Sequence, residues 1–211
     1  MAKIAELPRS RNNRKPGFTV LIVCEGAKTE RTYLKSYKRR NTGVKIEIPN
    51  TGDTDPLNLV EFAALKADEL GINKRTGNVW IVFDVDVNSD AVLNKARSNA
   101  RRISKKKQYN MEVILSNPSF ELWYLLHFTT ASTAALTNTV LIDKLKRYLN
   151  GYDKAVNYYA TLKPLQETAI ANAHNLNDFH NGQGRDLYTR DSNPSTQVVK
   201  LVEYLNKITE G

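Results

Sequence analysis

Between residues 18 and 115, short apolar runs alternate with stretches that have the spacing of amphipathic helices. The apolar runs lie at 18–24, 44–48, 79–83 and 111–115, and the helical stretches at about 28–40, 56–70 and 90–107. Strands that alternate with helices in this way form parallel sheets through right-handed crossovers. The pattern therefore predicts an α/β fold with a parallel four-stranded sheet flanked by helices.

After residue 115 the pattern predicts only helices. They are expected from Pro118 to Phe128 and at about 140–150, 152–161, 163–177 and 194–207, with a loop at 129–139. This change of pattern divides the chain into three predicted parts. They are a basic N-terminal arm at 1–17, an α/β domain at 18–128, and an all-helical C-terminal extension at 129–211 packed on that domain.

Two of the predicted strands end in carboxylates. Glu25 follows FTVLIVC, and Asp84 and Asp86 follow VWIVF. In parallel α/β sheets the carboxyl ends of the strands open onto the ligand crevice. Two aspartates separated by one residue point the same way along a strand, so both can hold one Mg²⁺ or Mn²⁺ ion. Glu25 can ligate the same metal or move a proton during attack on phosphorus. Acidic doublets also occur at helix caps and in turns, so a purely structural role of these aspartates is the competing interpretation.

The positive charge of the chain is concentrated near its start. The chain has 31 Lys and Arg against 22 Asp and Glu, a net charge of +9, and the first fifty residues hold twelve Lys or Arg against four Glu, a net of +8. Such a concentration favours a polyanionic partner, and positive flanks around an acidic metal site suit a phosphodiester backbone. The alternative is that these basic residues only form solvent-exposed helix faces and bind no partner. The candidate nucleic-acid contacts are Arg31, Lys35, Lys38, Arg97, Arg101, Lys154 and Arg190.

The cysteine content and the apolar runs limit the kinds of metal site and the cellular compartment that are expected. The single Cys24 excludes an internal disulfide and a cysteine-based zinc site, so a metal would need oxygen ligands or the three histidines. No apolar run reaches the roughly 18 residues of a membrane span, and the first 17 residues lack the apolar core of a secretory signal. We therefore expect a cytoplasmic protein without membrane contact.

Four sequence motifs occur in a characteristic order. They are IVCEGAKTE (22–30), FDVD (83–86), SNPSFELWYLLHF (116–128) and NPST (193–196). Together they resemble the RloB-like family, a group of Toprim-domain proteins associated with bacterial restriction and abortive-infection loci. The resemblance covers about 18–208. Toprim proteins share the Glu after the first strand and the D-x-D after the third, whereas SNPSFELW followed by NPST is specific to the RloB-like group.

The resemblance implies particular roles. Glu25 is the expected general acid or base, and Asp84 and Asp86 are the expected metal ligands. A charged residue commonly stands between the two aspartates in this family, and here Val85 takes that place. The resemblance also implies nuclease activity in antiviral defence, on tRNA, other RNA or DNA.

Further polar residues join the candidate site. Lys28, beside Glu25, can stabilise charge on a transferring phosphoryl group. Asn117 and Glu121 are polar in an apolar run, so they are candidates for supporting residues around the metal, although Asn117 can instead cap a helix. Two functions remain open: a Mg²⁺- or Mn²⁺-dependent nuclease, or a nucleic-acid-binding subunit that turns over only when a partner ATPase activates it.

Overall fold

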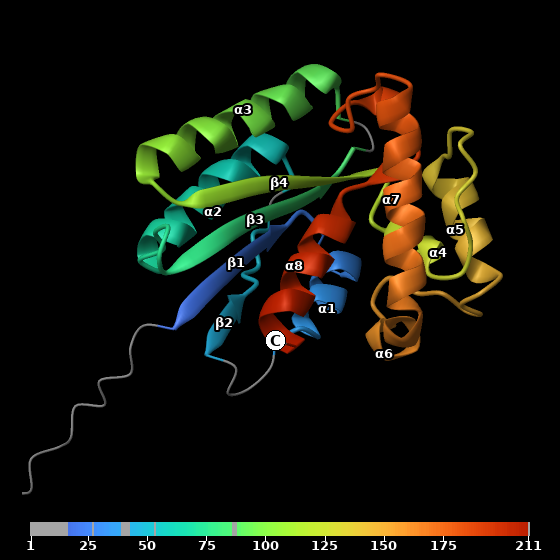
Figure 1. The fold of residues 1–211 in the computed structure, drawn as a ribbon, viewed down its shortest axis with the longest axis horizontal. Coiled ribbons are helices and arrows are strands. Elements are labelled where there is room, and N and C mark those ends of the chain that lie inside the picture. The colour runs from blue at the N-terminus through green and yellow to red at the C-terminus, as the bar shows by residue number, and fades with distance from the viewer. Residues whose placement is uncertain (1–16, 27, 39–42, 53, 86–87, 211) are drawn as a thin grey trace, which may run out of the picture.

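The sheet has five strands in the order β2-β1-β3-β4-β5 (Figure 1). The computed structural model describes residues 17–26, 28–38, 43–52, 54–85 and 88–210. The strands are β1 (Phe18–Cys24), β2 (Val44–Glu47), β3 (Gly77–Asp84), β4 (Asn110–Asn117) and β5 (Ser195–Thr196). The first four strands are parallel, and β5 pairs antiparallel with β4. The α/β prediction is confirmed, but the sheet is mostly parallel and has a fifth strand from the C-terminal part.

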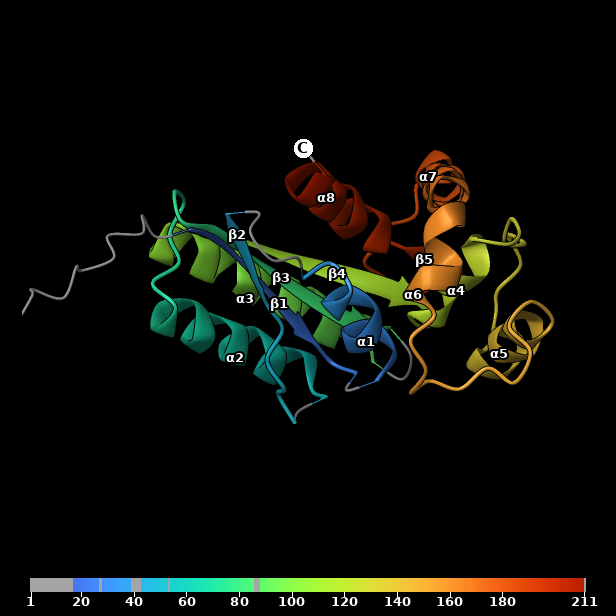
Figure 2. The same ribbon diagram turned by 90° about the horizontal axis from the view of Figure 1, so that it is seen from below.

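Helices cover both faces of the sheet (Figures 1 and 2). The helices on one face are α1 (Thr29–Lys35) and α8 (Val198–Glu210), and those on the other are α2 (Pro56–Glu69) and α3 (Asp90–Lys107). Successive side chains of a strand point to opposite faces. Accordingly, Val20 and Ile22 of β1 join the core under α1, and Leu21 and Val23 join the core under α2.

The remaining helices gather at the carboxyl end of β4. They are α4 (Glu121–Leu126), α5 (Asn138–Lys146), α6 (Tyr159–Leu162) and α7 (Gln166–Gly182), with short 3₁₀ turns η1 (Lys163–Leu165) and η2 (Arg190–Ser192). The predicted helix at 163–177 is present and extends to Gly182. All six residues of α4 are buried, which explains the continuous apolar pattern of that segment.

The predicted helix at 152–161 is wrong, because only its last three residues are helical, in α6. The Asp153 side chain accepts a hydrogen bond from the Ala155 N–H at 2.8 Å, and the Asn157 side chain accepts one from the Tyr159 N–H at 2.9 Å. Such local bonds compete with helical hydrogen bonding. The segment is therefore a loop, and it carries Lys154.

The chain returns from α7 to the sheet through β5. The Gln197 N–H donates to the Leu115 carbonyl at 2.9 Å, and the Leu115 N–H donates to Gln197 Oε1 at 3.1 Å. The hydroxyls of Ser116 and Thr196 are 2.8 Å apart. These buried contacts fix the C-terminal part against the end of β4. Among the described helices, none has the length and apolar character needed to cross a membrane.

Candidate functional site

A pocket of about 450 Å³ opens at the carboxyl end of the sheet. The chain leaves β1 toward one face, through α1, and leaves β3 toward the other face, through α3 (Figure 2). Neighbouring strands whose connections diverge in this way leave a crevice between them, which is where open α/β sheets bind ligands. Glu25 follows β1 and Asp84 is the last residue of β3, so both meet at this crevice.

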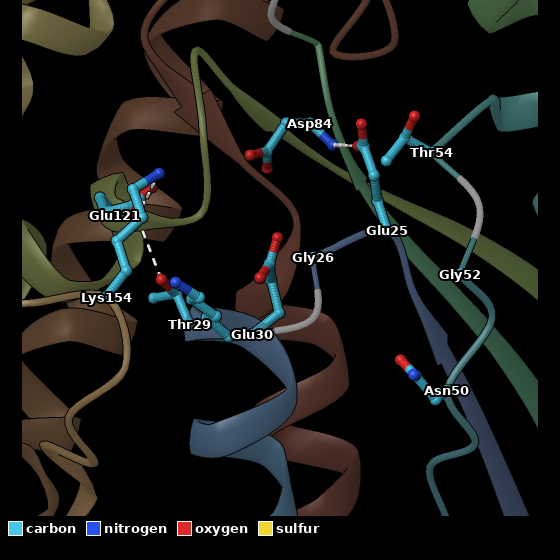
Figure 3. A pocket seen from close by; sticks show the side chains of 11 residues that line it. Glu25, Gly26, Thr29, Glu30, Asn50, Gly52, Thr54, Asp84, Glu121 and Lys154 are labelled. Atoms are coloured by element: carbon cyan, nitrogen blue, oxygen red, sulfur yellow. Dashed lines mark hydrogen bonds and ion pairs between the residues drawn. The ribbon is translucent and has the colours of Figure 1, made fainter.

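Four carboxylates and two ammonium groups line the pocket (Figure 3). They are Glu25, Glu30, Asp84, Glu121, Lys28 and Lys154. Two of the acids come from the β1–α1 segment, one from β3 and one from α4. The structure therefore brings together five residues that the sequence singled out and adds Glu30, which it did not.

Glu25 and Asp84 are in direct contact. The Asp84 N–H donates to Glu25 Oε2 at 2.9 Å, which holds the Glu25 side chain against the end of β3 (Figure 3). Asp84 is partly buried, and its Oδ1 is inaccessible to solvent and has no hydrogen-bond partner in the described part of the chain. Burial raises the pKa of Asp84 well above its usual range, and the charges of Glu30, Glu121 and Glu25 raise it further. The pocket thus holds more carboxyl groups than ammonium groups, and the crowding disfavours ionisation of all four acids together.

Glu30 contributes a carboxylate that sequence reasoning missed. It lies in the first turn of α1, is only 5% exposed, and points toward Asp84 (Figure 3). Its carboxylate lies against Gly26, where any Cβ would overlap it. Burial raises the pKa of Glu30 to about 7, and the charges of Glu121 and Glu25 act in the same direction. The signal in the sequence was the second acid of CEGAKTE, five residues after Glu25.

One carboxylate oxygen of Glu121 is engaged by three neighbouring donors. Its Oε1 accepts hydrogen bonds from Thr29 at 3.2 Å and Tyr152 at 3.0 Å, and it forms an ion pair with Lys154 Nζ at 3.1 Å. Burial acts to raise the pKa of Glu121, but the Lys154 ammonium and the hydrogen bonds outweigh it and leave this pKa below its usual range. Glu121 is therefore ionised and neutralised within the pocket wall.

Lys28 and Asn117 differ in their position relative to the pocket. Lys28 lines the pocket, is exposed, and has no ion-pair partner among the described residues. Asn117 lies outside the acidic pocket, since its amide donates to the carbonyls of Thr189 and Arg190, both at 3.2 Å. Asp86 lies outside the described residues.

Three candidate nucleic-acid contacts lie on α1 or just after it, and none of them lines the pocket. Arg31 donates to the Ile48 carbonyl through Nε and Nη2, each at 3.4 Å, so it also ties α1 to the end of β2. Lys38 is 3.8 Å from a Glu47 carboxylate oxygen. Lys35 is exposed and has no ion-pair partner in the part of the chain that is described. Tyr33 and Tyr37 face the core, as the helical spacing predicts.

The candidates on α3 lie across the sheet from α1. Arg97 forms an ion pair with Asp186 at 3.2 Å, and its guanidinium carbon lies 3.7 Å from the centroid of the Tyr188 ring. Arg97 thus ties α3 to the loop before β5. Arg101 is exposed beside it, and Arg190 is exposed in η2.

These features define an α/β protein with an acidic pocket where the connections of its two central strands diverge. The sequence matches the family described as RloB-like protein over residues 20–205, and the chain belongs to that family. No curated protein and no solved structure matches the chain. Within the described residues, no group of three or more His, Cys, Asp or Glu side chains is already arranged to hold a metal ion.

Proposed function

We propose that this protein is a divalent-metal-dependent nuclease that hydrolyses phosphodiester bonds of nucleic acid, with RNA such as tRNA as the first candidate substrate. The observation that carries the proposal is the Asp84 carboxylate, whose buried Oδ1 has no hydrogen-bond partner among the described residues, in a pocket with three other acids. Buried polar atoms are normally satisfied, and crowded carboxylates favour a cation. The association of RloB-like proteins with defence loci extends the proposal to a role in antiviral defence.

The donors in the pocket suit Mg²⁺ or Mn²⁺, because both ions prefer carboxylate oxygen and keep several water ligands. Asp84, Glu25 and Glu30 would hold the ion, with Asp86 as a further ligand expected from the sequence. When bound, the ion would supply Lewis-acid stabilisation of negative charge on the phosphate.

The other steps of the reaction are assigned to individual side chains of the pocket. Glu25, held by the Asp84 N–H, is the proposed acceptor of the proton lost by the attacking water. Lys28 lies at the exposed side of the pocket, where an ammonium can bind a phosphate oxygen. The basic side of α1 lies next to this opening and would bind the backbone of the substrate by charge.

The test is a cleavage assay with a matched control. Purified wild type, Glu25→Gln and Glu61→Gln are incubated with end-labelled tRNA, single-stranded RNA and duplex DNA in Mg²⁺, Mn²⁺ or EDTA. Glu61 is an exposed residue of α2 and does not line the pocket. We expect metal-dependent cleavage by wild type and Glu61→Gln, and a loss of at least about 100-fold in Glu25→Gln.

Two other outcomes have definite meanings. Cleavage that persists in EDTA or in Glu25→Gln contradicts the proposed site. If wild type binds nucleic acid but cuts it only after a partner ATPase is added, the second function, a partner-activated subunit, replaces autonomous activity.

A further inference from the structure

The acidic pocket has one cation that the fold holds in place, and it comes from the C-terminal part of the chain. Lys154 lies in the loop between α5 and α6, and its Nζ is 3.1 Å from Glu121 Oε1 (Figure 3). The Lys154 side chain is 58% exposed, whereas that of Glu121 is 2% exposed. The ammonium therefore lies at the pocket surface and rests on a buried anion.

The anion beneath Lys154 is itself held rigidly. Thr29 of α1 and Tyr152 of the Lys154 loop donate to the same Glu121 oxygen, at 3.2 and 3.0 Å. Glu121 thus joins α1, α4 and the loop, and its position fixes that of Lys154. The Oε1 of Glu121 accepts from all three donors, so its lone pairs are occupied. This geometry makes that oxygen a support for Lys154.

Lys154 still has donors for a ligand. An ammonium carries three N–H donors, and one ion-pair contact leaves the others directed toward the exposed side of the pocket. Lys154 lines the same pocket as Asp84 and Glu30, so its charge lies close to the centre of the site. Lys28 has no comparable anchoring contact among the described residues.

We propose that Lys154 binds a non-bridging oxygen of the substrate phosphate at the acidic pocket, and that Glu121 is a positioning residue that acts through Lys154. This inference rests on the proposed nuclease function. A donor that is already directed at the atom where negative charge develops needs little reorganisation during the reaction. Its removal therefore lowers the rate strongly. The C-terminal part of the chain would then complete a site whose carboxylates come from the sheet and from α1.

The test combines kinetics with metal binding. Cleavage kinetics are measured for wild type, Lys154→Gln, Lys154→Arg, Glu121→Gln and the Glu121→Gln/Lys154→Gln double variant, with Lys146→Gln as the control on exposed α5. We expect Lys154→Gln to lower kcat/KM about 100-fold, with arginine restoring most of it. Glu121→Gln keeps an acceptor for Thr29 and Tyr152, so it should fold, lose less activity, and add nothing to the loss in the double variant.

Mn²⁺ binding by calorimetry separates the two possible roles of Glu121. We expect Glu121→Gln to bind Mn²⁺ within about twofold of wild type, because its effect passes through Lys154. Loss of Mn²⁺ binding in Glu121→Gln, or wild-type kcat/KM in Lys154→Gln, overturns the proposal while leaving the nuclease intact. If wild type cuts no substrate in any metal, the proposed function fails and this inference falls with it.

Discussion

At the scale of single residues, Glu30 should make the stability of the metal-free protein depend on pH. Its pKa is raised from 4.5 to about 7, chiefly by burial. At Glu30 the folded state then binds more protons than the unfolded state between these values, so the contribution of Glu30 to stability is greatest below about pH 4.5 and is lost as the pH rises to about 7. The difference in pKa corresponds to at most about 3 kcal/mol. Chemical denaturation at pH 5 and pH 7.5, in EDTA, measures it.

The matched variants for this measurement are Glu30→Gln and Glu61→Gln. Glu30→Gln should remove the part of the pH dependence that comes from Glu30 and leave the part that comes from the buried Asp84, whose pKa is also raised, whereas Glu61→Gln, on the exposed side of α2, should retain both. A pH dependence in Glu30→Gln equal to that of metal-free wild type would show that Glu30 is not destabilised by its surroundings.

The residues of the site were predictable to different degrees. Glu25 and Asp84 stand out because an acid directly after a buried strand has no role in packing. Glu30 does not stand out, since an acid in the first turn of a helix is favoured by the helix dipole wherever the helix lies. Its burial depends on the contact of its carboxylate with Gly26 and on the neighbouring α4, which sequence spacing does not reveal.

At the scale of elements, the link between Gln197 and β4 should be important for stability. Gln197 is fully buried, and its side chain accepts from the Leu115 N–H and donates to the Leu187 carbonyl at 3.0 Å. Gln197→Ala leaves both groups without this partner, and we expect a loss of about 1–3 kcal/mol in the free energy of unfolding. Urea denaturation compares it with Gln183→Ala, at an exposed position after α7. Equal midpoints would contradict the assigned role of this link.

Elements were predictable where a periodic pattern extended over several residues. The four parallel strands and the helices between them have such patterns, and Asp55 caps α2 through its contacts with the Leu57 and Asn58 N–H groups. β5 has only two residues, so it has no detectable alternation. The segment 152–161 was expected to be helical, but Tyr152 and Tyr158 stack on each other within a loop, with ring centroids 5.5 Å apart.

At the scale of the whole molecule, the basic residues lie on both faces of the sheet. The pocket opens beside Lys28 and Thr29 at the start of α1, whereas Arg101 lies on α3, which covers the other face. A strand bound at the pocket should therefore follow α1. The slope of log affinity against log salt is proportional to the number of phosphate contacts. We expect Lys35→Gln to reduce this slope by the amount that corresponds to about one contact, and Arg101→Gln to leave it unchanged.

Fluorescence anisotropy with labelled single-stranded RNA, from 50 to 300 mM salt, measures these slopes. Asp84→Asn can serve as the background for all variants, so that cleavage does not disturb binding. A smaller slope in Arg101→Gln and an unchanged slope in Lys35→Gln would place the nucleic acid on the α3 side instead. Neither assignment was accessible from sequence, because helical spacing gives the face of a helix but not the face of the sheet that the helix covers.

The proposed function depends most on a divalent-cation site around Asp84. Titration of metal-free protein with Mn²⁺, followed by calorimetry in the absence of nucleic acid, tests it directly. We predict saturable binding by wild type and by Glu61→Gln, and loss of that binding in Asp84→Asn, with the variant still folded by circular dichroism. Absence of binding in wild type, or unchanged binding in folded Asp84→Asn, would contradict the site.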